Sequence, residues 1–233
     1  MTNATFSDLG LSQAILDALS AKGFEEPTPI QALAIPRLLA GNAHLLAKAR
    51  TGTGKTAAFG LPLVERLSAP GPKPRALVLV PTRELALQVS TEISSFSRSG
   101  CPRIATIYGG ASMGEQLRRL SRGVDLVVGT PGRVLDHLER GTLDLSALEW
   151  LVLDEADEML DMGFIEDIEK VMDAANPERR VVLFSATMPP AILRIARDRL
   201  GEFEKVEDST DPVKAGLTDQ IWLEVRERDK LEA

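Results

Sequence analysis

The sequence has few of the residues that build disulfide bonds, zinc sites or membrane spans. Of its 233 residues only one is a cysteine, Cys101, and two are histidines, His44 and His137. A single cysteine cannot form an internal disulfide, and with two histidines it makes no obvious zinc cluster. No uninterrupted apolar stretch approaches the roughly 20 residues that cross a bilayer, and residues 1–10 lack a signal-peptide pattern. We therefore expect a cytoplasmic protein without a membrane partner.

An overall excess of basic charge is also lacking. The net charge is −7 and the isoelectric point is near 5.0, which argues at first against a nucleic-acid partner. The charge is unevenly distributed, however: residues 73–140 carry ten Lys and Arg against six Asp and Glu, so this stretch is +4 and the remainder is −11. The count allows a local basic surface, although a chance fluctuation in surface charge would give the same count.

Apolar runs rich in Val, Ile and Leu alternate with longer segments of helical character. Continuous apolar runs are typical of strands buried on both faces, and strands that alternate with helices predict a parallel sheet. We therefore expect a RecA-like P-loop α/β domain with helices on both faces of the sheet. The predicted strands are 44–47, 76–80, 104–108, 126–128, 151–153 and 181–184.

A phosphate-binding loop is predicted between the first of these strands and the helix that follows it. Its core is Gly52-Thr53-Gly54-Lys55-Thr56, and Ala49 stands where the usual pattern has glycine. Glycines let backbone N–H groups converge on a phosphate, Lys55 would reach the β- and γ-phosphates, and Thr56 would bind Mg²⁺. The predicted nucleotide-binding residues of this loop are Ala49, Arg50, Thr51, Gly52, Thr53, Gly54, Lys55 and Thr56.

Polar clusters follow several other predicted strands, and the carboxyl ends of parallel strands share one edge of a sheet. Among them, Asp154-Glu155-Ala156-Asp157 follows the apolar run 150–153. Taken alone, an acidic quartet is more often a solvated loop or helix cap. Paired with a phosphate loop, it predicts ATP hydrolysis, with Asp154 holding Mg²⁺ through water and Glu155 orienting the attacking water.

These four letters spell the name of the DEAD-box RNA helicases, and the chain resembles that family from about Phe6 to Thr187. The stretches 140–146 and 162–167 are most similar to bacterial members. The resemblance implies an ATP-dependent RNA helicase that uses ATP and Mg²⁺ to separate RNA strands locally. Residues 23–31 resemble the family's Q motif, which implies that Thr28 and Gln31 bind adenine and that Phe6 or Phe24 packs on the base. From the residues alone, Phe6 and Phe24 are core residues and Gln31 is a surface helix residue.

The resemblance also implies contacts with the RNA backbone and a coupling element. Hydroxyls, exposed amides and arginines all donate to phosphate oxygens, and such contacts do not read sequence. Without the resemblance, each cluster is more often a strand-to-helix turn, where Pro, Thr and Gly are common for backbone reasons, and the two interpretations do not exclude each other. The implied RNA-binding residues are Pro81, Thr82, Arg83, Gly109, Gly110, Thr130, Pro131, Gly132 and Arg133. Ser185-Ala186-Thr187 matches the motif thought to link the nucleotide site to unwinding, and we expect a hydroxyl of this motif to bond to Asp157.

Three parts are expected along the chain. Residues 1–43 would form a helical segment, with helices from Ser12 to Leu19 and from 27–29 to about Leu39, packed on the core. Residues 44–207 would form the first RecA-like domain, and residues 208–233 would be a linker and the opening strand of a second, truncated RecA-like domain. Because an arginine of that second domain would complete the ATP site, we expect the isolated chain to be a monomer that binds nucleotide but hydrolyses ATP slowly.

Two other functions remain open. The first is a P-loop ATPase of the same fold that acts on DNA or protein, against which the Gln31 segment and the complete acidic quartet weigh. The second is a non-enzymatic module that binds RNA or a partner. A pure scaffold would not need Lys55, Asp154 and Glu155, so their presence argues against it.

Overall fold

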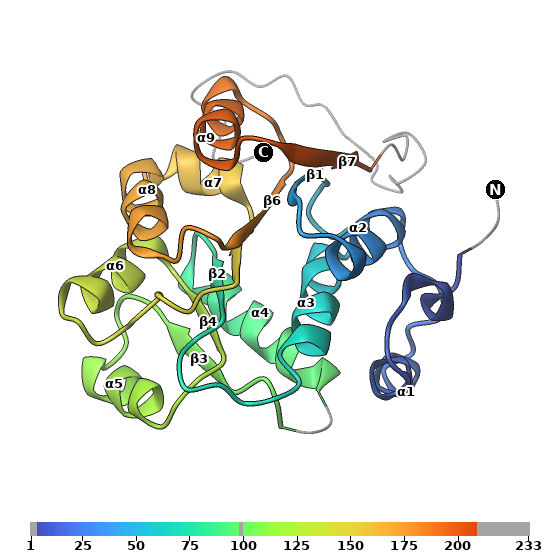
Figure 1. Ribbon diagram of the computed structural model, residues 1–233, viewed down its shortest axis with the longest axis horizontal. Helices are drawn as coiled ribbons and strands as arrows, with labels where there is room; N and C mark the ends of the chain where they lie inside the picture. The colour runs from blue at the N-terminus through green and yellow to red at the C-terminus, as the bar shows by residue number, and fades with distance from the viewer. Residues whose placement is uncertain (1–3, 98–99, 209–233) are drawn as a thin grey trace, which may run out of the picture.

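The computed structural model describes residues 4–97 and 100–208, and within them seven strands form one parallel sheet (Figure 1). The strand order is β3-β4-β2-β5-β6-β1-β7, and every neighbouring pair is parallel. The predicted α/β fold with a parallel sheet is confirmed. The strands are β1 (His44–Lys48), β2 (Ala76–Leu79), β3 (Ile104–Ile107), β4 (Leu126–Gly129), β5 (Trp150–Leu153), β6 (Arg180–Ser185) and β7 (Phe203–Glu207).

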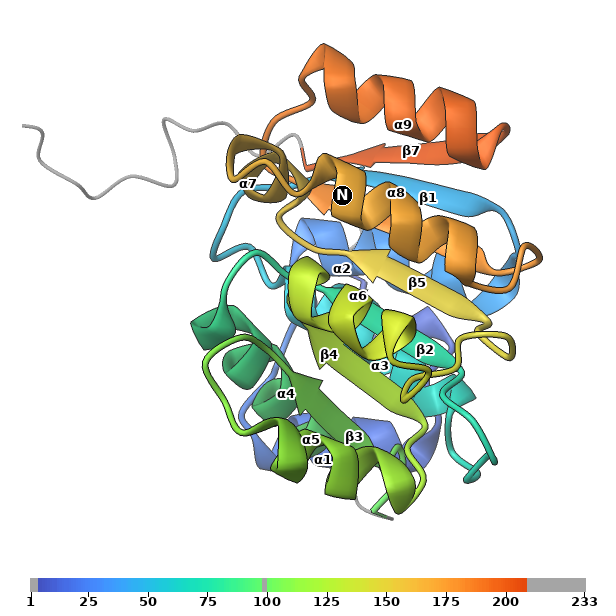
Figure 2. The ribbon, with the colours of Figure 1, turned by 90° about the vertical axis from the view of Figure 1, so that its left-hand side faces the viewer.

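Helices cover both faces of the sheet, as predicted. One side carries the 3₁₀ helix η1 (Phe6–Leu9) with α1 (Gln13–Ala21), α2 (Pro29–Ala40), α3 (Lys55–Arg66) and α4 (Arg83–Phe96). Figure 2 looks onto the other side, which carries α5 (Met113–Ser121), α6 (Pro131–Glu139), α7 (Ala156–Asp161), α8 (Ile165–Ala174) and α9 (Pro190–Leu200). The helices predicted from Ser12 and from residues 27–29 correspond to α1 and α2, which begin directly after Ser12 and Thr28.

The central strands are buried on both faces, which explains their continuous apolar runs. All four residues of β2 are buried. Ala76 and Val78 point into the core under α2, α3 and α4, whereas Leu77 and Leu79 point into the core on the opposite face. Because successive side chains of a strand alternate between faces, a strand between two helix layers must be apolar at every position.

One strand was missed by the sequence reading. β7 lies at the edge of the sheet beside β1, and its sequence is Phe-Glu-Lys-Val-Glu, of which only Val206 is buried. Its charged residues make ion pairs instead: Lys48 Nζ lies 2.6 Å from Glu207, and Arg37 Nε lies 3.3 Å from Glu204. β7 is open to solvent and has no continuous apolar run, whereas β3, at the other edge, is largely apolar. The criterion that found the other strands therefore could not find β7.

The remaining predictions about organisation concern the ends of the chain. The N-terminal segment contacts the core through α2 against α3 and through α1 against α4. The opening strand of the predicted second domain lies outside the described residues, and the predicted division of the chain into three parts stays a prediction. No helix in the described part of the chain is long and apolar enough to cross a membrane.

Candidate functional site

The predicted phosphate loop connects the end of β1 at Lys48 to the start of α3 at Lys55, as the sequence indicated. Gly54 precedes the helix with φ +87°, a left-handed conformation that side chains with a Cβ rarely adopt. A Cβ on Gly54 would also lie 2.3 Å from Nε2 of Gln31. Backbone conformation and close approach therefore both require glycine here, which leaves the loop backbone open to a ligand.

The acidic quartet follows β5, two strands away from β1, and its first two carboxylates meet the loop lysine. Lys55 Nζ lies 3.2 Å from Glu155 Oε1 and 3.8 Å from Asp154 Oδ1. The hydroxyl of Thr51 donates to Glu155 Oε1 at 3.2 Å. Lys55 and Asp154 are buried, and Glu155 is mostly covered. Two predicted catalytic segments that are 100 residues apart in sequence are thus in direct contact.

Asp154 is a buried acid with few hydrogen-bond donors around it. It accepts one backbone hydrogen bond, from the N–H of Glu155 at 3.0 Å. The pKa of Asp154 is raised to about 6, chiefly by burial and also by the carboxylates of Glu155 and Glu92, while Lys55 and that N–H act in the opposite direction. A cation beside this carboxylate would offset its poorly solvated charge, so the environment of Asp154 suits a divalent metal ion.

Within residues 4–97 and 100–208, no group of three or more His, Cys, Asp and Glu side chains is arranged to hold a metal. Magnesium commonly binds through one or two protein ligands, with phosphate oxygens and waters completing the shell. The buried carboxylate of Asp154 therefore fits a magnesium that arrives with a nucleotide and not a permanently bound ion, and coordination of that ion by Thr56 stays a prediction.

Glu155 has an unusual backbone. Its φ is +55°, and among the described residues it is the only one besides glycines with a positive φ. It stands between the end of β5 and the first turn of α7. A non-glycine residue in this region costs of order 1 kcal/mol and persists where the surroundings hold it, typically at functional sites. The strained backbone of Glu155 lowers the stability of the fold and holds the Glu155 carboxylate next to Lys55.

Gln31 is not the surface residue that its position in a helix suggested. It is 1% exposed, its Nε2 donates to the carbonyl of Gly54 at 3.1 Å, and its Oε1 accepts from the N–H of Thr28 at 3.0 Å. These two bonds fix which end of the amide is oxygen. Thr28 Oγ1, nearby, is buried without a hydrogen-bond partner. The amide keeps one N–H and one acceptor site for a ligand.

The two predicted base-stacking phenylalanines lie in or against the core. Phe6 is 5% exposed and packs edge-on against Phe24, with ring centroids 6.2 Å apart. Phe24 is half-buried and packs in the same way on Phe96 of α4. The core interpretation is correct for Phe6, and a contact of either ring with a base stays a prediction.

The predicted link between the acidic quartet and Ser185-Ala186-Thr187 is present. Asp157 Oδ2 accepts from the hydroxyl of Thr187 at 2.9 Å and from its N–H at 2.8 Å. The N–H of Asp157 donates to the hydroxyl of Ser185 at 3.2 Å. Burial alone would raise the pKa of Asp157, but the bonds from Thr187 and Ser185 outweigh it and lower the pKa. The ends of β5 and β6 are therefore joined by hydroxyl groups.

The residues assigned to RNA lie at the ends of β2, β3 and β4. Arg83 is exposed, and its guanidinium carbon lies 5.1 Å from the centre of the Tyr108 ring, a residue the sequence reading did not select. Gly109 and Gly110 follow Tyr108 and are exposed. Arg133 Nη1 lies 3.4 Å from the carbonyl of Ala111. The three segments thus contact one another.

The predicted RNA-binding residues differ in how exposed they are to solvent. Pro81 and Pro131 are buried, so their rings are not available to a ligand and serve the turns that begin α4 and α6. Thr82 and Thr130 stand at the N-caps of those helices, and the Thr82 hydroxyl accepts from the N–H of Leu85 at 3.2 Å. Gly132, next to a buried proline, is exposed.

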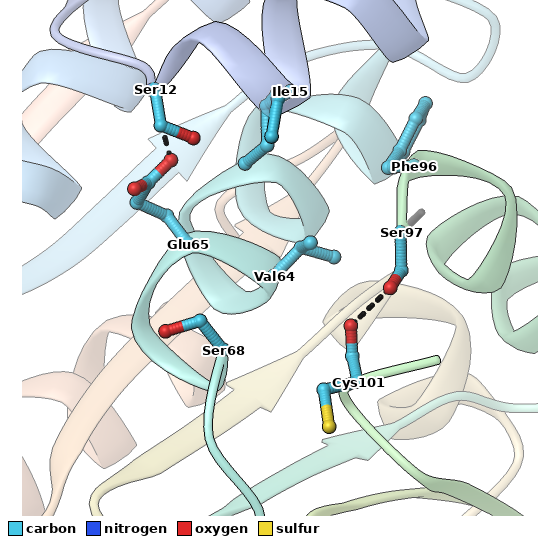
Figure 3. A pocket seen from close by; sticks show the side chains of 9 residues that line it. Ser12, Ile15, Val64, Glu65, Ser68, Phe96, Ser97 and Cys101 are labelled. Atoms are coloured by element: carbon cyan, nitrogen blue, oxygen red, sulfur yellow. Dashed lines mark hydrogen bonds between the residues drawn. The ribbon is translucent and has the colours of Figure 1, made fainter. Parts of the chain in front are cut away.

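A separate cavity of about 250 Å³ lies between α1, the end of α3 and the end of α4 (Figure 3). Its lining is mostly apolar, and the N–H of Ser12 donates to Glu65 at its edge. None of the predicted site residues lines it. The cavity marks the seam where the N-terminal segment packs on the core.

Comparison with known proteins agrees with the motifs. Residues 28–195 match the family model described as DEAD/DEAH box helicase. The chain is 47% identical to the DEAD-box ATP-dependent RNA helicase CshA of Geobacillus kaustophilus, over 98% of this chain and 49% of that protein. It is 50% identical to the ATP-dependent RNA helicase DeaD of Escherichia coli K12, over 94% of this chain and 35% of that protein.

The solved structures agree as well. A DEAD box protein from the hyperthermophile Methanococcus jannaschii superposes with a TM-score of 0.86 at 45% identity, over 98% of this chain and 61% of that one. The RecA-like assignment of the fold is therefore confirmed. The chain spans about half the length, or less, of CshA and DeaD.

Proposed function

Because the chain belongs to the DEAD/DEAH box helicase family, we propose that it is the ATP-binding half of an ATP-dependent RNA helicase. The observation that carries this proposal is the meeting of the phosphate loop with the acidic quartet, in which Lys55 contacts both Glu155 and Asp154. The full activity, strand separation in RNA driven by ATP hydrolysis, is proposed for the longer protein, since CshA and DeaD are about twice this length or more.

Each residue of that cluster has a proposed role. Lys55 exchanges its contact with Glu155 for the β- and γ-phosphates of the nucleotide, while the loop amides of residues 52–54 hold the phosphates. Thr56, and Asp154 through water, would hold Mg²⁺, which would supply positive charge that offsets the charge of the phosphates. Glu155, released from Lys55 and Thr51, is then free to orient the attacking water and accept its proton.

Gln31 would select the base. Its fixed amide has one N–H and one oxygen lone pair left, which suits the adjacent acceptor and donor on the edge of adenine. Guanine presents two acceptors on the same edge, and the amide can satisfy only one. The unpartnered Thr28 Oγ1 adds a further polar group beside the base.

Calorimetric titration with Mg-ADP and Mg-GDP tests the nucleotide site. The wild-type chain should prefer ADP by about tenfold or more, since a missing partner for one buried polar group costs about 1–3 kcal/mol. Gln31→Ala should lose the preference, and Gln88→Ala, at an exposed glutamine of α4, should keep it. Equal binding of both nucleotides by the wild type would refute the base-selecting role, and absence of binding would refute the nucleotide site.

The RNA surface would lie along the ends of β2, β3 and β4. Arg83 and Arg133, with the exposed backbone of Gly109, Gly110 and Gly132, would donate to phosphate oxygens without reading sequence. Binding of a single-stranded RNA to the chain should therefore weaken steeply with salt. Arg83→Ala should reduce the affinity to a similar extent for RNAs of different sequence.

The isolated chain should hydrolyse ATP slowly. An arginine supplied across a domain interface contributes about 10³ to 10⁵ in rate to phosphoryl transfer, and we propose that a second RecA-like domain supplies it. The monomeric 233-residue chain should bind nucleotide with little RNA-stimulated turnover. Robust RNA-stimulated ATPase activity of the purified chain would refute the requirement for a second domain.

A further inference from the structure

A buried chain of polar side chains lies beneath the proposed RNA surface, and no motif discussed above includes it. Gln116 of α5 is 4% exposed and His137 of α6 is fully buried. Gln116 Nε2 donates to the carbonyl of Tyr108 at 3.0 Å, and Gln116 Oε1 lies 3.1 Å from His137 Nε2. His137 Nδ1 lies 2.8 Å from the hydroxyl of Thr142. Four residues from three segments are thus connected in a line.

The chemistry of this chain fixes its hydrogens. A carbonyl only accepts, so the amide nitrogen of Gln116 must face Tyr108 and its oxygen must face His137. His137 must then donate from Nε2, so the Nδ1 of the neutral ring is an acceptor. The one hydroxyl hydrogen of Thr142 is shared between this Nδ1 and the backbone carbonyl of His137, which lies 3.0 Å from the hydroxyl oxygen. Burial and the nearby Arg133 lower the pKa of His137, which keeps the ring neutral. The orientation of both side chains is therefore fixed by their neighbours.

Tyr108 is where this chain meets the RNA surface. Its ring lies under the guanidinium of Arg83, its carbonyl is held by Gln116, and Gly109 and Gly110 follow it directly. Gly110 has a φ of +81°, so the chain turns sharply here. The position of Tyr108 therefore sets both the arginine above it and the exposed amides after it.

A second hydrogen bond to this turn, from Arg133, is weak, and Arg133 is also a proposed contact for RNA phosphates. Arg133 Nη1 reaches the carbonyl of Ala111 at 3.4 Å, near the limit for a hydrogen bond, and Arg133 Nε lies 3.7 Å from Asp136. If Arg133 moves to an RNA phosphate, it gives up Ala111. The Gln116 bond to Tyr108 then remains to hold the turn against α6.

We propose that Gln116 and His137 are positioning residues for RNA: through His137, which lies in the last turn of α6, the pair ties the turn at Tyr108–Gly110 to that helix, so that the three RNA-contacting segments stay in register. This inference rests on the proposed function, because it assigns a role within the same RNA surface. Neither side chain touches RNA, since both are buried.

Paired substitutions in the full 233-residue chain test the proposal. Gln116→Leu removes both bonds at similar volume, and His137→Leu removes one end of the pair. His137→Gln restores a donor toward Gln116. Single-stranded RNA affinity, measured by fluorescence anisotropy, should fall about tenfold for Gln116→Leu and severalfold for His137→Leu, and it should stay within about threefold of wild type for His137→Gln.

Mg-ADP affinity separates positioning from general loss of structure, and it should change by less than about twofold in all three variants. Thr106→Val is the matched control, because it removes a hydrogen bond of 2.9 Å between β3 and Ser90 of α4, on the face of the sheet opposite to α5 and α6. It should leave RNA affinity unchanged. Unchanged RNA binding by Gln116→Leu, or equal losses of RNA and Mg-ADP affinity, would overturn the positioning role alone. Failure of the wild-type chain to bind RNA would overturn the proposed RNA surface itself.

Discussion

Two buried aspartates, one at the amino ends of the strands and one at the carboxyl ends, have opposite environments. Asp125, just before β4, is fully buried and accepts four hydrogen bonds, one from the N–H of Gly71 and three from Arg103, at 2.7–2.9 Å. Asp154, just after β5, is 4% exposed and accepts one backbone hydrogen bond, with Lys55 Nζ 3.8 Å away. Both carboxylates lose their hydration on folding, but only Asp125 regains it as hydrogen bonds from the protein.

The pKa values record this difference. Burial alone would raise the pKa of Asp125, but the bonds from Arg103 and Gly71 outweigh it and lower the pKa. At Asp154 burial prevails and the pKa is about 6. A carboxylate that only stabilises the fold is surrounded by donors, whereas one that must receive a cation is left with room for it. Incomplete compensation is therefore the physical signature of the functional end of this sheet.

Removing the compensated aspartate should give the largest effect. Asp125→Ala leaves Arg103 and the N–H of Gly71 without their partner, and we expect a loss of about 3 kcal/mol in the free energy of unfolding, measured with urea. The control is Asp144→Ala, an exposed carboxylate 2.7 Å from Lys73, which should cost less than about 0.5 kcal/mol. Equal losses in the two variants would show that burial of the ion pair at Asp125 is unimportant.

Removing the uncompensated aspartate should have the opposite sign. Asp154→Asn abolishes a poorly solvated charge, and we expect the unliganded chain to gain about 1–3 kcal/mol at pH 7, while Mg²⁺-dependent binding of nucleotide weakens. Asp125→Asn, tested alongside, should destabilise.

The pH dependence of that gain follows from the raised pKa. Above pH 6 the folded protein holds the charged carboxylate and pays the penalty in full. As the pH falls below 6, Asp154 takes up a proton in the folded state, so the gain from Asp154→Asn should shrink, and it should disappear below the ordinary value of 3.8. Urea unfolding at pH 7.5 and pH 4.5 compares the gain in the free energy of unfolding above and below the raised pKa. A gain of equal size at the two pH values would contradict the assignment.

Asp157, the third carboxylate of the acidic quartet, is compensated to a degree between that of Asp125 and that of Asp154. Thr187→Val removes one of the bonds that lower its pKa, so the pKa of Asp157 should rise and the free energy of unfolding should fall by about 1 kcal/mol. NMR titration of the carboxyl group and urea unfolding give the two readouts. Thr91→Val is the control, since the Thr91 hydroxyl bonds to the carbonyl of Leu87 within an exposed part of α4.

The same hydroxyls carry a proposed coupling role that only the longer protein can test. If Ser185 and Thr187 transmit the state of the nucleotide site to RNA, Ser185→Ala with Thr187→Ala should reduce the number of base pairs unwound per ATP consumed. An unchanged ratio in the double variant would leave the Asp157 bonds with a structural role alone.

The features that the sequence predicted are those whose signal is local. The apolar runs predicted six strands because the central strands are buried on both faces and the edge strand β3 is also largely apolar. The phosphate loop was recognised because glycine and lysine are required at fixed spacing. β7 was missed because its own sequence lacks an apolar run. Gln31 was placed in the nucleotide site through family resemblance, but its burial under Gly54 depends on packing between segments 23 residues apart.

Gln116 and His137 show where sequence reading stops. A glutamine among charged residues in α5 and a histidine in the last turn of α6 have ordinary surroundings in sequence. Their importance comes from meeting each other across 21 residues beneath a turn, and from the carbonyl that Gln116 holds. Nothing in spacing or residue type announces a contact between the buried faces of two helices.

The smallest expected effect is the pH dependence that the two histidines contribute. Burial lowers the pKa of His44, with help from Arg179 and Arg180, and burial also lowers the pKa of His137. Both rings are therefore neutral in the fold, and His44 Nδ1 accepts from the N–H of Val181 at 2.9 Å. As the pH falls below about 6.5, the unfolded chain takes up protons that the folded chain does not, so stability falls.

Asp154 opposes this trend over the same pH range, because its protonation stabilises the fold as the pH falls. The Asp154→Asn background removes that opposition, so the decline in the free energy of unfolding from pH 7 to pH 5 should be steeper there than in the wild type. Adding His44→Gln and His137→Gln should flatten it. If the decline in the free energy of unfolding keeps its slope without the histidines, the acid sensitivity comes from other groups. The cost of burying an ionisable group, which explains Asp154, would then not explain the behaviour of the two imidazoles.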